Sequence, residues 1–193
     1  MRCAKPLLAT FILLCCSASM FAQMPSPPPA KTPGDALGAT LGIVEHEFVP
    51  TAEAMPEDKY DFAPSGTGDF KGVRTFAQQV KHVAATNYVF ASIITGEKAP
   101  VDTGGENGPD TLKTKADILK FLNDSFAQLH KALASVTDKN QLDQMDSPFG
   151  MKTAKLSWAS FSLAHPMDHY GQMVEYLRMN GIVPPASRPQ NNK

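Results

Sequence analysis

Two histidines near the end of the chain, His165 and His169, have a spacing that suits metal binding. On a helix, residues four apart lie on one face, one turn apart, so both imidazoles can reach one ion. His82 could supply a third nitrogen from another helix. Three neutral imidazoles leave one position of a zinc-like ion open, as in catalytic rather than structural zinc sites. Such an ion would lower the pKa of a metal-bound water, bind a thiolate or polarise a carbonyl.

The spacing alone is a weak indication of a metal site, because two partly buried histidines on a helix give the same pattern. Position 166 is proline, so the adjacent glutamate of the metalloprotease motif is missing. Pro166 removes a backbone donor and disfavours helical geometry at His165. We therefore expect either a kink there or a new helix that begins at Pro166.

Four helical segments must position these histidines. Apolar residues at helical spacing and terminal capping or stop signals place the segments at about residues 35–55, 75–95, 114–136 and 156–180. Strand-like alternation of useful length is missing, so the sequence predicts an all-α four-helix bundle. Its long inter-helix loops, residues 56–74, 96–113 and 137–155, permit parallel neighbouring helices.

His82 lies on a second face of its segment. At about 100° per residue, it is some 120° away from the main apolar stripe that contains Phe76 and Val80. It shares its own, partly apolar face with Thr86 and Val89. We therefore expect the His82 side chain to point into a seam between helices rather than into open water.

The first 22 residues are typical of a secretory signal peptide. Arg2 and Lys5 precede a short apolar run, and small residues follow at positions 17–22. The run is short for a membrane span, although an uncleaved anchor is the alternative. We expect a cleaved signal, a periplasmic or secreted protein, and no stable membrane span after cleavage. The chain's three cysteines all lie in this segment, so the mature protein would have no disulfide and no cysteine ligand.

The rest of the chain divides into three parts. Residues 23–34 form a proline-rich linker, residues 35–185 form the bundle, and residues 186–193 form a flexible tail. The formal net charge is −1, and loss of Arg2 and Lys5 with the signal would change it to −3. Without a basic excess or a cluster of lysines and arginines, the sequence gives no support for nucleic-acid binding.

Three motifs, in order along the chain, resemble those of the DinB-like superfamily. They are PEDKYDFAP at residues 56–64, RTFAQQVKHVAATNYVF at residues 74–90, and HPMDHYGQMVEYLRMNGIVPP at residues 165–185. The resemblance covers about residues 35–185 and implies an up-down-down-up bundle, commonly a homodimer. It also implies that His82, His165 and His169 hold zinc or nickel. Relatives include metal-dependent thiol transferases and isomerases. Pro166 and the export signal are departures from the usual pattern.

The leading hypothesis is therefore an exported metal-dependent hydrolase or group (thiol) transferase that acts on a small molecule. An exported protein would meet few of the low-molecular-weight thiols found in the cytosol, which disfavours thiol transfer. One alternative is a non-catalytic metal-binding or stress-associated bundle in which the ion ties two helices together. Another is a structural bundle without an ion.

Several other polar and aromatic residues have weaker claims to a role. We expect His46 to lie on a solvated helix face, His130 on a helix flank, and Glu106 to be a solvated charge. Asn87, on an apolar stripe, needs a buried partner or faces the site. One of four residues could orient a ligating imidazole: Asp168, Tyr170, Gln172 and Glu175. Four residues are expected in the core: Trp158, Phe161, Met173 and Tyr176.

Overall fold

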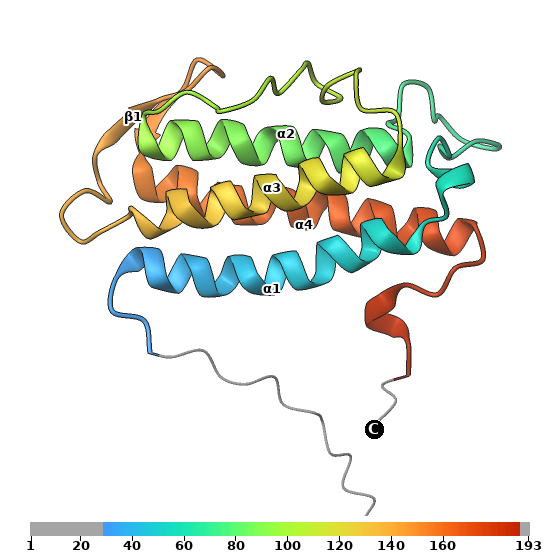
Figure 1. The fold of residues 1–193 in the computed structure, drawn as a ribbon, viewed down its shortest axis with the longest axis horizontal. Helices are drawn as coiled ribbons and strands as arrows, with labels where there is room; N and C mark the ends of the chain where they lie inside the picture. The colour runs from blue at the N-terminus through green and yellow to red at the C-terminus, as the bar shows by residue number, and fades with distance from the viewer. Residues whose placement is uncertain (1–28, 190–193) are drawn as a thin grey trace, which may run out of the picture.

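The computed structural model describes residues 29–189 (Figure 1). Within that range the chain forms four α-helices, which confirms the helical class. They are α1 (Pro33–Ala54), α2 (Phe76–Thr95), α3 (Lys115–Ala134) and α4 (Lys155–Met179). The connection between α1 and α2 contains a 3-10 turn, η1 (Glu57–Lys59), and a second one, η2 (Pro185–Ser187), follows α4. The proposed signal peptide, the first half of the linker and the end of the tail lie outside the described residues.

Local capping explains where three of the helices begin. Thr32 and Asp35 form a capping box at the start of α1, and Thr75 and Gln78 form another at the start of α2. The Thr114 side chain accepts a hydrogen bond from the backbone of Asp117 at the start of α3. Gly96 ends α2 with a φ of 78°, a left-handed conformation that glycine adopts without strain.

The helices pack so that α2 and α4 are neighbours. α1 contacts α3 and α4, and α2 contacts the same two helices, which places α1 and α2 on opposite sides of the bundle. Large apolar side chains fill the space between the four helices. The largest fully buried ones include Phe48, Phe76, Phe90, Phe126, Trp158 and Met173. This core fixes the seam between α2 and α4, in which the histidines lie.

A short hairpin departs from the all-helical expectation. Strands β1 (Gln144–Asp146) and β2 (Lys152–Ala154) pair antiparallel, with Met145 opposite Thr153, and β2 leads directly into α4. Each strand has three residues, which is too short for apolar alternation to be recognised in a sequence. The tight turn between them uses Gly150, whose φ is 73°.

Pro166 lies inside α4. The helix runs from Lys155 to Met179 without a break, so the expectation of a new helix beginning at Pro166 is wrong. An internal proline costs about 3 kcal/mol because it removes one backbone hydrogen bond and crowds the preceding turn. Burial of the Pro166 ring in the bundle offsets part of this cost. His165 and His169 therefore occupy successive turns of one helix.

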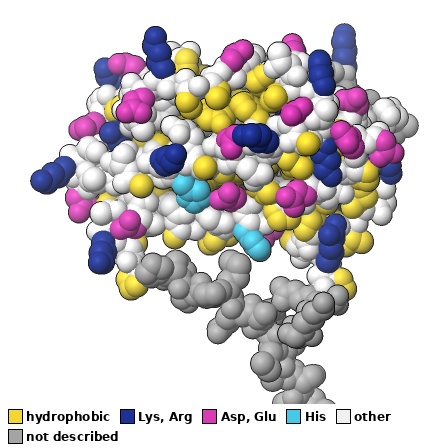
Figure 2. All heavy atoms as spheres, in the orientation of Figure 1, with side chains coloured by type: hydrophobic (Ala, Val, Ile, Leu, Met, Phe, Trp, Pro, Cys, Tyr) yellow, Lys and Arg dark blue, Asp and Glu magenta, His cyan; other side chains and the backbone are white. Residues whose placement is uncertain are grey.

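The two ends of the described chain lie on one side of the bundle. In Figure 1 the chain enters α1 and leaves after η2 below α1, whereas the connection between α2 and α3 runs above α2. None of the helices in residues 29–189 combines the length and apolarity needed to cross a bilayer. Acidic and basic side chains intermingle over the face drawn in Figure 2.

Candidate metal centre

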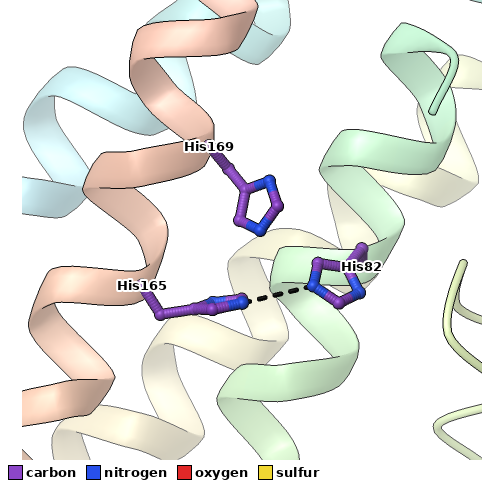
Figure 3. Close-up of side chains that lie close together, drawn as sticks. All are labelled: His82, His165 and His169. Carbon is purple, nitrogen blue, oxygen red and sulfur yellow. Dashed lines mark hydrogen bonds between the residues drawn. The ribbon is translucent and has the colours of Figure 1, made fainter. Parts of the chain in front are cut away.

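Three imidazole rings meet between α2 and α4 (Figure 3). His82 comes from α2, whereas His165 and His169 come from α4. Each residue offers one ring nitrogen, and these three atoms all lie within 4.8 Å of one another. The ring centroids are 4.7 to 5.1 Å apart. The structure therefore brings together all three residues that the sequence proposes as metal ligands.

The spacing of the nitrogens fits one ion. The Nε2 atoms of His82 and His165 are 3.2 Å apart. Two nitrogens that bind one tetrahedral zinc ion at about 2.0–2.1 Å lie about 3.3–3.4 Å apart. The distance between these two nitrogens is thus already close to the distance between two ligand atoms of a tetrahedral zinc ion.

The site is largely shielded from solvent. The side chains of His82 and His169 are buried, and His165 is half-buried. The expectation that His82 points into a seam between helices is confirmed. The rings of Phe90 and Phe161 lie 5.6 and 6.2 Å from that of His165, on the side of the site towards the start of α4.

Each histidine has a hydrogen-bond partner at Nδ1. The partner of His82 is the backbone carbonyl of Glu106, that of His165 is Thr86 Oγ1 at 3.3 Å, and that of His169 is Gln79 Oε1 at 2.6 Å. The Thr86 hydroxyl donates to backbone carbonyls of α2, so its oxygen accepts from His165. With Nδ1 donating in all three rings, every Nε2 keeps its lone pair for a metal ion.

A chain of polar side chains fixes the protonation of His169. Gln172 Nε2 donates to Asp168 Oδ2, and Gln79 Nε2 donates to Gln172 Oε1. Because a carboxylate can only accept, Asp168 sets the orientation of the Gln172 amide, which in turn sets that of Gln79. Gln79 Oε1 then faces His169, whose Nδ1 must carry the proton.

Substitution of Gln79 tests the importance of this chain. Gln79→Leu keeps the side-chain size but removes the acceptor for His169, and it should weaken zinc binding by about 10- to 100-fold. Competition with a chromophoric zinc indicator measures the change. Gln128→Leu, on α3, is the matched control and should bind as the wild type does. Equal affinity in the Gln79 and Gln128 variants would contradict the proposed role.

Burial keeps the three imidazoles uncharged. Desolvation, together with the neighbouring histidines and the Arg74 guanidinium, lowers the pKa of His165 to about 3 and that of His169 to about 4. Desolvation also lowers the pKa of His82. Neutral imidazoles are the form that binds metal, so few protons compete with an ion near pH 7.

These pKa values predict that acid destabilises the metal-free protein. The unfolded chain takes up protons on His165 and His169 near pH 6.5, whereas the folded chain does so only near pH 3–4. The free energy of unfolding therefore falls as the pH drops through this window, by at most about 1.4 kcal/mol per pH unit for each histidine. Urea unfolding between pH 7.5 and 4.5 measures the slope. It should be shallower in the His165→Gln/His169→Gln variant, and unchanged in His46→Gln. The same slope in all three proteins would contradict the assignment.

A cavity of about 470 Å³ lies further along α2. Its lining includes Val89, Ile93, Ala99 and Met145, from α2, the following loop and β1. Val89 and Ile93 continue the face of α2 that carries His82 and Thr86, at spacings of three and four residues. This hollow, whose lining also includes Ser92, Gln144 and Asp146, has the size of a site for part of a small molecule.

The remaining residues singled out in the sequence have other partners. His130 Nε2 lies 2.8 Å from Glu45 Oε2, and the Tyr170 hydroxyl donates to Glu47. His46 is exposed, as expected, and Glu175 pairs with Arg178. Of the four candidates for orienting a ligand, Asp168 and Gln172 act on His169 through Gln79.

Three expectations about environment have clear outcomes. Asn87 is buried and donates to Ser125 of α3, so it serves the core rather than the site. Trp158, Met173 and Tyr176 are buried as predicted, whereas Phe161 is 49% exposed and edges against Phe90. The helix carries Phe161 to the rim of the histidine cluster.

Sequence reasoning missed the direct acceptors of the three histidines. Gln79 and Thr86 lie three residues before and four residues after His82, which places them on its face of α2. That spacing was an available signal. The Glu106 side chain is exposed, as expected, and pairs with Arg74 at 2.9 Å, but its backbone carbonyl contacts His82. Because every residue has a backbone carbonyl, the sequence does not indicate which one accepts a hydrogen bond.

Comparison with known proteins gives a consistent family. The sequence model of the DinB superfamily matches residues 40–173. The uncharacterised protein YjoA of Bacillus subtilis (strain 168) is 25% identical over 134 residues, which make up 67% of this chain and 79% of YjoA.

Two crystal structures resemble this fold. A DinB-like protein of Bacillus cereus ATCC 10987 has a TM-score of 0.61 and 16% identity, over 76% of this chain and 94% of that one. The B. subtilis YjoA structure has a TM-score of 0.59 and 18% identity, over 76% and 92%. At these identities the structural likeness concerns the fold.

Proposed function

The chain belongs to the DinB superfamily, and from this premise we propose that it is a metal-dependent enzyme acting on a small molecule. The proposed activity is that of a hydrolase or of a group (thiol) transferase. The observation that carries the proposal is the convergence of His82, His165 and His169, each with a hydrogen-bond partner at Nδ1. A zinc or nickel ion suits imidazole ligands.

The ligand set favours catalysis over a purely structural ion. Three protein nitrogens leave a coordination position open for water or substrate. An ion bound there acts as a Lewis acid, which lowers the pKa of water or polarises a carbonyl. The protein's own part is to hold the imidazoles neutral and oriented. The cavity beyond Thr86, lined by Val89 and Ile93, offers room for the substrate.

Location, topology and assembly are part of the same proposal. We place the mature protein in the periplasm or outside the cell, because residues 1–22 have the composition of a signal peptide. This location favours hydrolysis over transfer of a cytosolic thiol. We also propose the up-down-down-up order, supported by the colour gradient in Figure 1, which runs one way along α1 and α4 and the other way along α2 and α3. A homodimer is the expected assembly.

Metal analysis followed by activity screening tests the function. Protein purified without a histidine tag should contain about one zinc or nickel ion per chain. A panel of small esters, amides, phosphoesters and thiol-acceptor pairs should reveal turnover that chelation abolishes and added metal restores. A metal content well below one ion per chain that added zinc or nickel does not raise would overturn the metal site. Full occupancy without metal-dependent turnover across the panel would overturn the catalytic role.

A further inference from the structure

A glycine-rich turn presses against α2 beside the histidine cluster. We call this segment, residues 104–109, the 104–109 turn. It contains an isolated antiparallel bridge between Gly105 and Gly108. Gly108 has a φ of 71°, and a Cβ there would lie 2.7 Å from Lys81 Cβ and 2.8 Å from the Lys81 carbonyl oxygen. Only glycine permits so close an approach without displacement. The Lys81 ammonium donates to the carbonyl of Pro109 at 3.1 Å, which fastens the end of the turn to the same helix residue.

Arg74 fastens the other side of the 104–109 turn. Its Nε donates to Asn107 Oδ1 at 3.0 Å, and its Nη2 donates to Glu106 Oε2 at 2.9 Å. The Arg74 carbonyl accepts a hydrogen bond from the hydroxyl of Tyr176, on α4. Arg74, which directly precedes the N-cap of α2, therefore connects the turn to α4, the helix that carries the other two histidines.

The 104–109 turn carries the acceptor of His82. The Glu106 backbone carbonyl accepts from His82 Nδ1. A histidine ring can rotate about two side-chain bonds, and a hydrogen bond at Nδ1 holds Nε2 towards the cluster. A backbone carbonyl is only as fixed as the turn that presents it. In this turn, fixation comes from the contact of Gly108 with α2 and from the side chain of Arg74.

We propose that the 104–109 turn is a positioning element for His82, and that Gly108 and Arg74 are the positioning residues that set the metal affinity of the centre. The proposal rests on the metal binding put forward above. The loop between α2 and α3 is mostly polar and exposed, but this part of it is held by Arg74, which lies just before α2, and by Lys81 of α2. Its contacts add no ligand. They hold the third imidazole in the orientation that the α4 pair requires.

Two alanine substitutions in the same turn separate positioning from general loop effects. Gly108→Ala forces the turn away from α2, whereas Gly105→Ala meets no heavy atom within 4 Å and has no left-handed backbone. Zinc affinity is measured by indicator competition, below the melting temperature. The absorption spectrum of the cobalt(II)-loaded protein reports ligand geometry independently of stability. Gly108→Ala should bind zinc about 10- to 100-fold more weakly with an altered cobalt spectrum, and Gly105→Ala should match the wild type.

If Gly108→Ala does not fold, Arg74→Met provides the test. It removes the hydrogen bonds of Arg74 to Asn107 and Glu106 and should weaken zinc binding by the same factor. Wild-type zinc affinity and cobalt spectrum in a folded Gly108→Ala protein, or failing that in Arg74→Met, would overturn the positioning role. Absence of zinc binding in the wild type would instead overturn the proposed function. The two failures are therefore distinguishable.

Discussion

Replacement of His82 by alanine is expected to reduce zinc affinity at least about a thousandfold, which corresponds to about 4 kcal/mol. His82 is the ligand that α2 contributes, and without it the ion would meet only the His165–His169 pair of α4. Two nitrogens on one helix do not enclose an ion. The loss of the His82 imidazole leaves the ion one protein ligand short. Titration against a chromophoric indicator at pH 7.5 measures the loss.

His130→Ala is the matched control for this experiment. His130 is half-buried and pairs with Glu45, and its ring is not part of the cluster. This variant should keep the zinc affinity of the wild type. Comparable zinc binding by the His82 and His130 variants would show that the ion, if any, binds elsewhere.

Metal removal should produce the second large effect, a loss of thermal stability. An ion between α2 and α4 binds the folded state only, so a thousandfold excess over Kd stabilises the fold by about 4 kcal/mol. For a domain of this size, that corresponds to a rise of about 8–16 °C in Tm. Calorimetry with chelator, then with excess zinc or nickel, measures the difference.

The shift should depend on the histidines rather than on nonspecific ion binding. Calcium has a preference for oxygen ligands and should leave Tm unchanged. The His82→Ala protein should show little response to zinc. A rise in Tm of equal size in that variant would place the stabilising ion outside the cluster.

The helices and the histidines could be predicted because their signals are local. Capping residues such as Thr75 and Thr114 mark helix starts, and the observed helix ends lie within about two residues of the expected ones. The three histidines stand out through the spacing of His165 and His169 and through the family-like motif around His82. Pro166 misled the local interpretation, because packing in the bundle overrides the preference of proline for a helix start.

The surroundings of the histidines could not be predicted, because they depend on contacts between residues that are far apart in the sequence. The hairpin that precedes α4 has strands too short to recognise, and the contact of Gly108 with Lys81 joins residues that no periodicity relates. The Glu106 acceptor is a backbone atom. The chain from Asp168 to Gln79 crosses between two helices, so its order appears only once α2 and α4 lie side by side.

The position of the chain ends has a practical consequence. Both ends of the described chain lie below α1, whereas the connection that carries the 104–109 turn runs over α2 on the other side (Figure 1). A fluorophore, carrier protein or solid support joined to either end would sit behind the domain, with the histidine-bearing half turned outwards. Immobilised protein should therefore remain suitable for screening ligands on sensor surfaces.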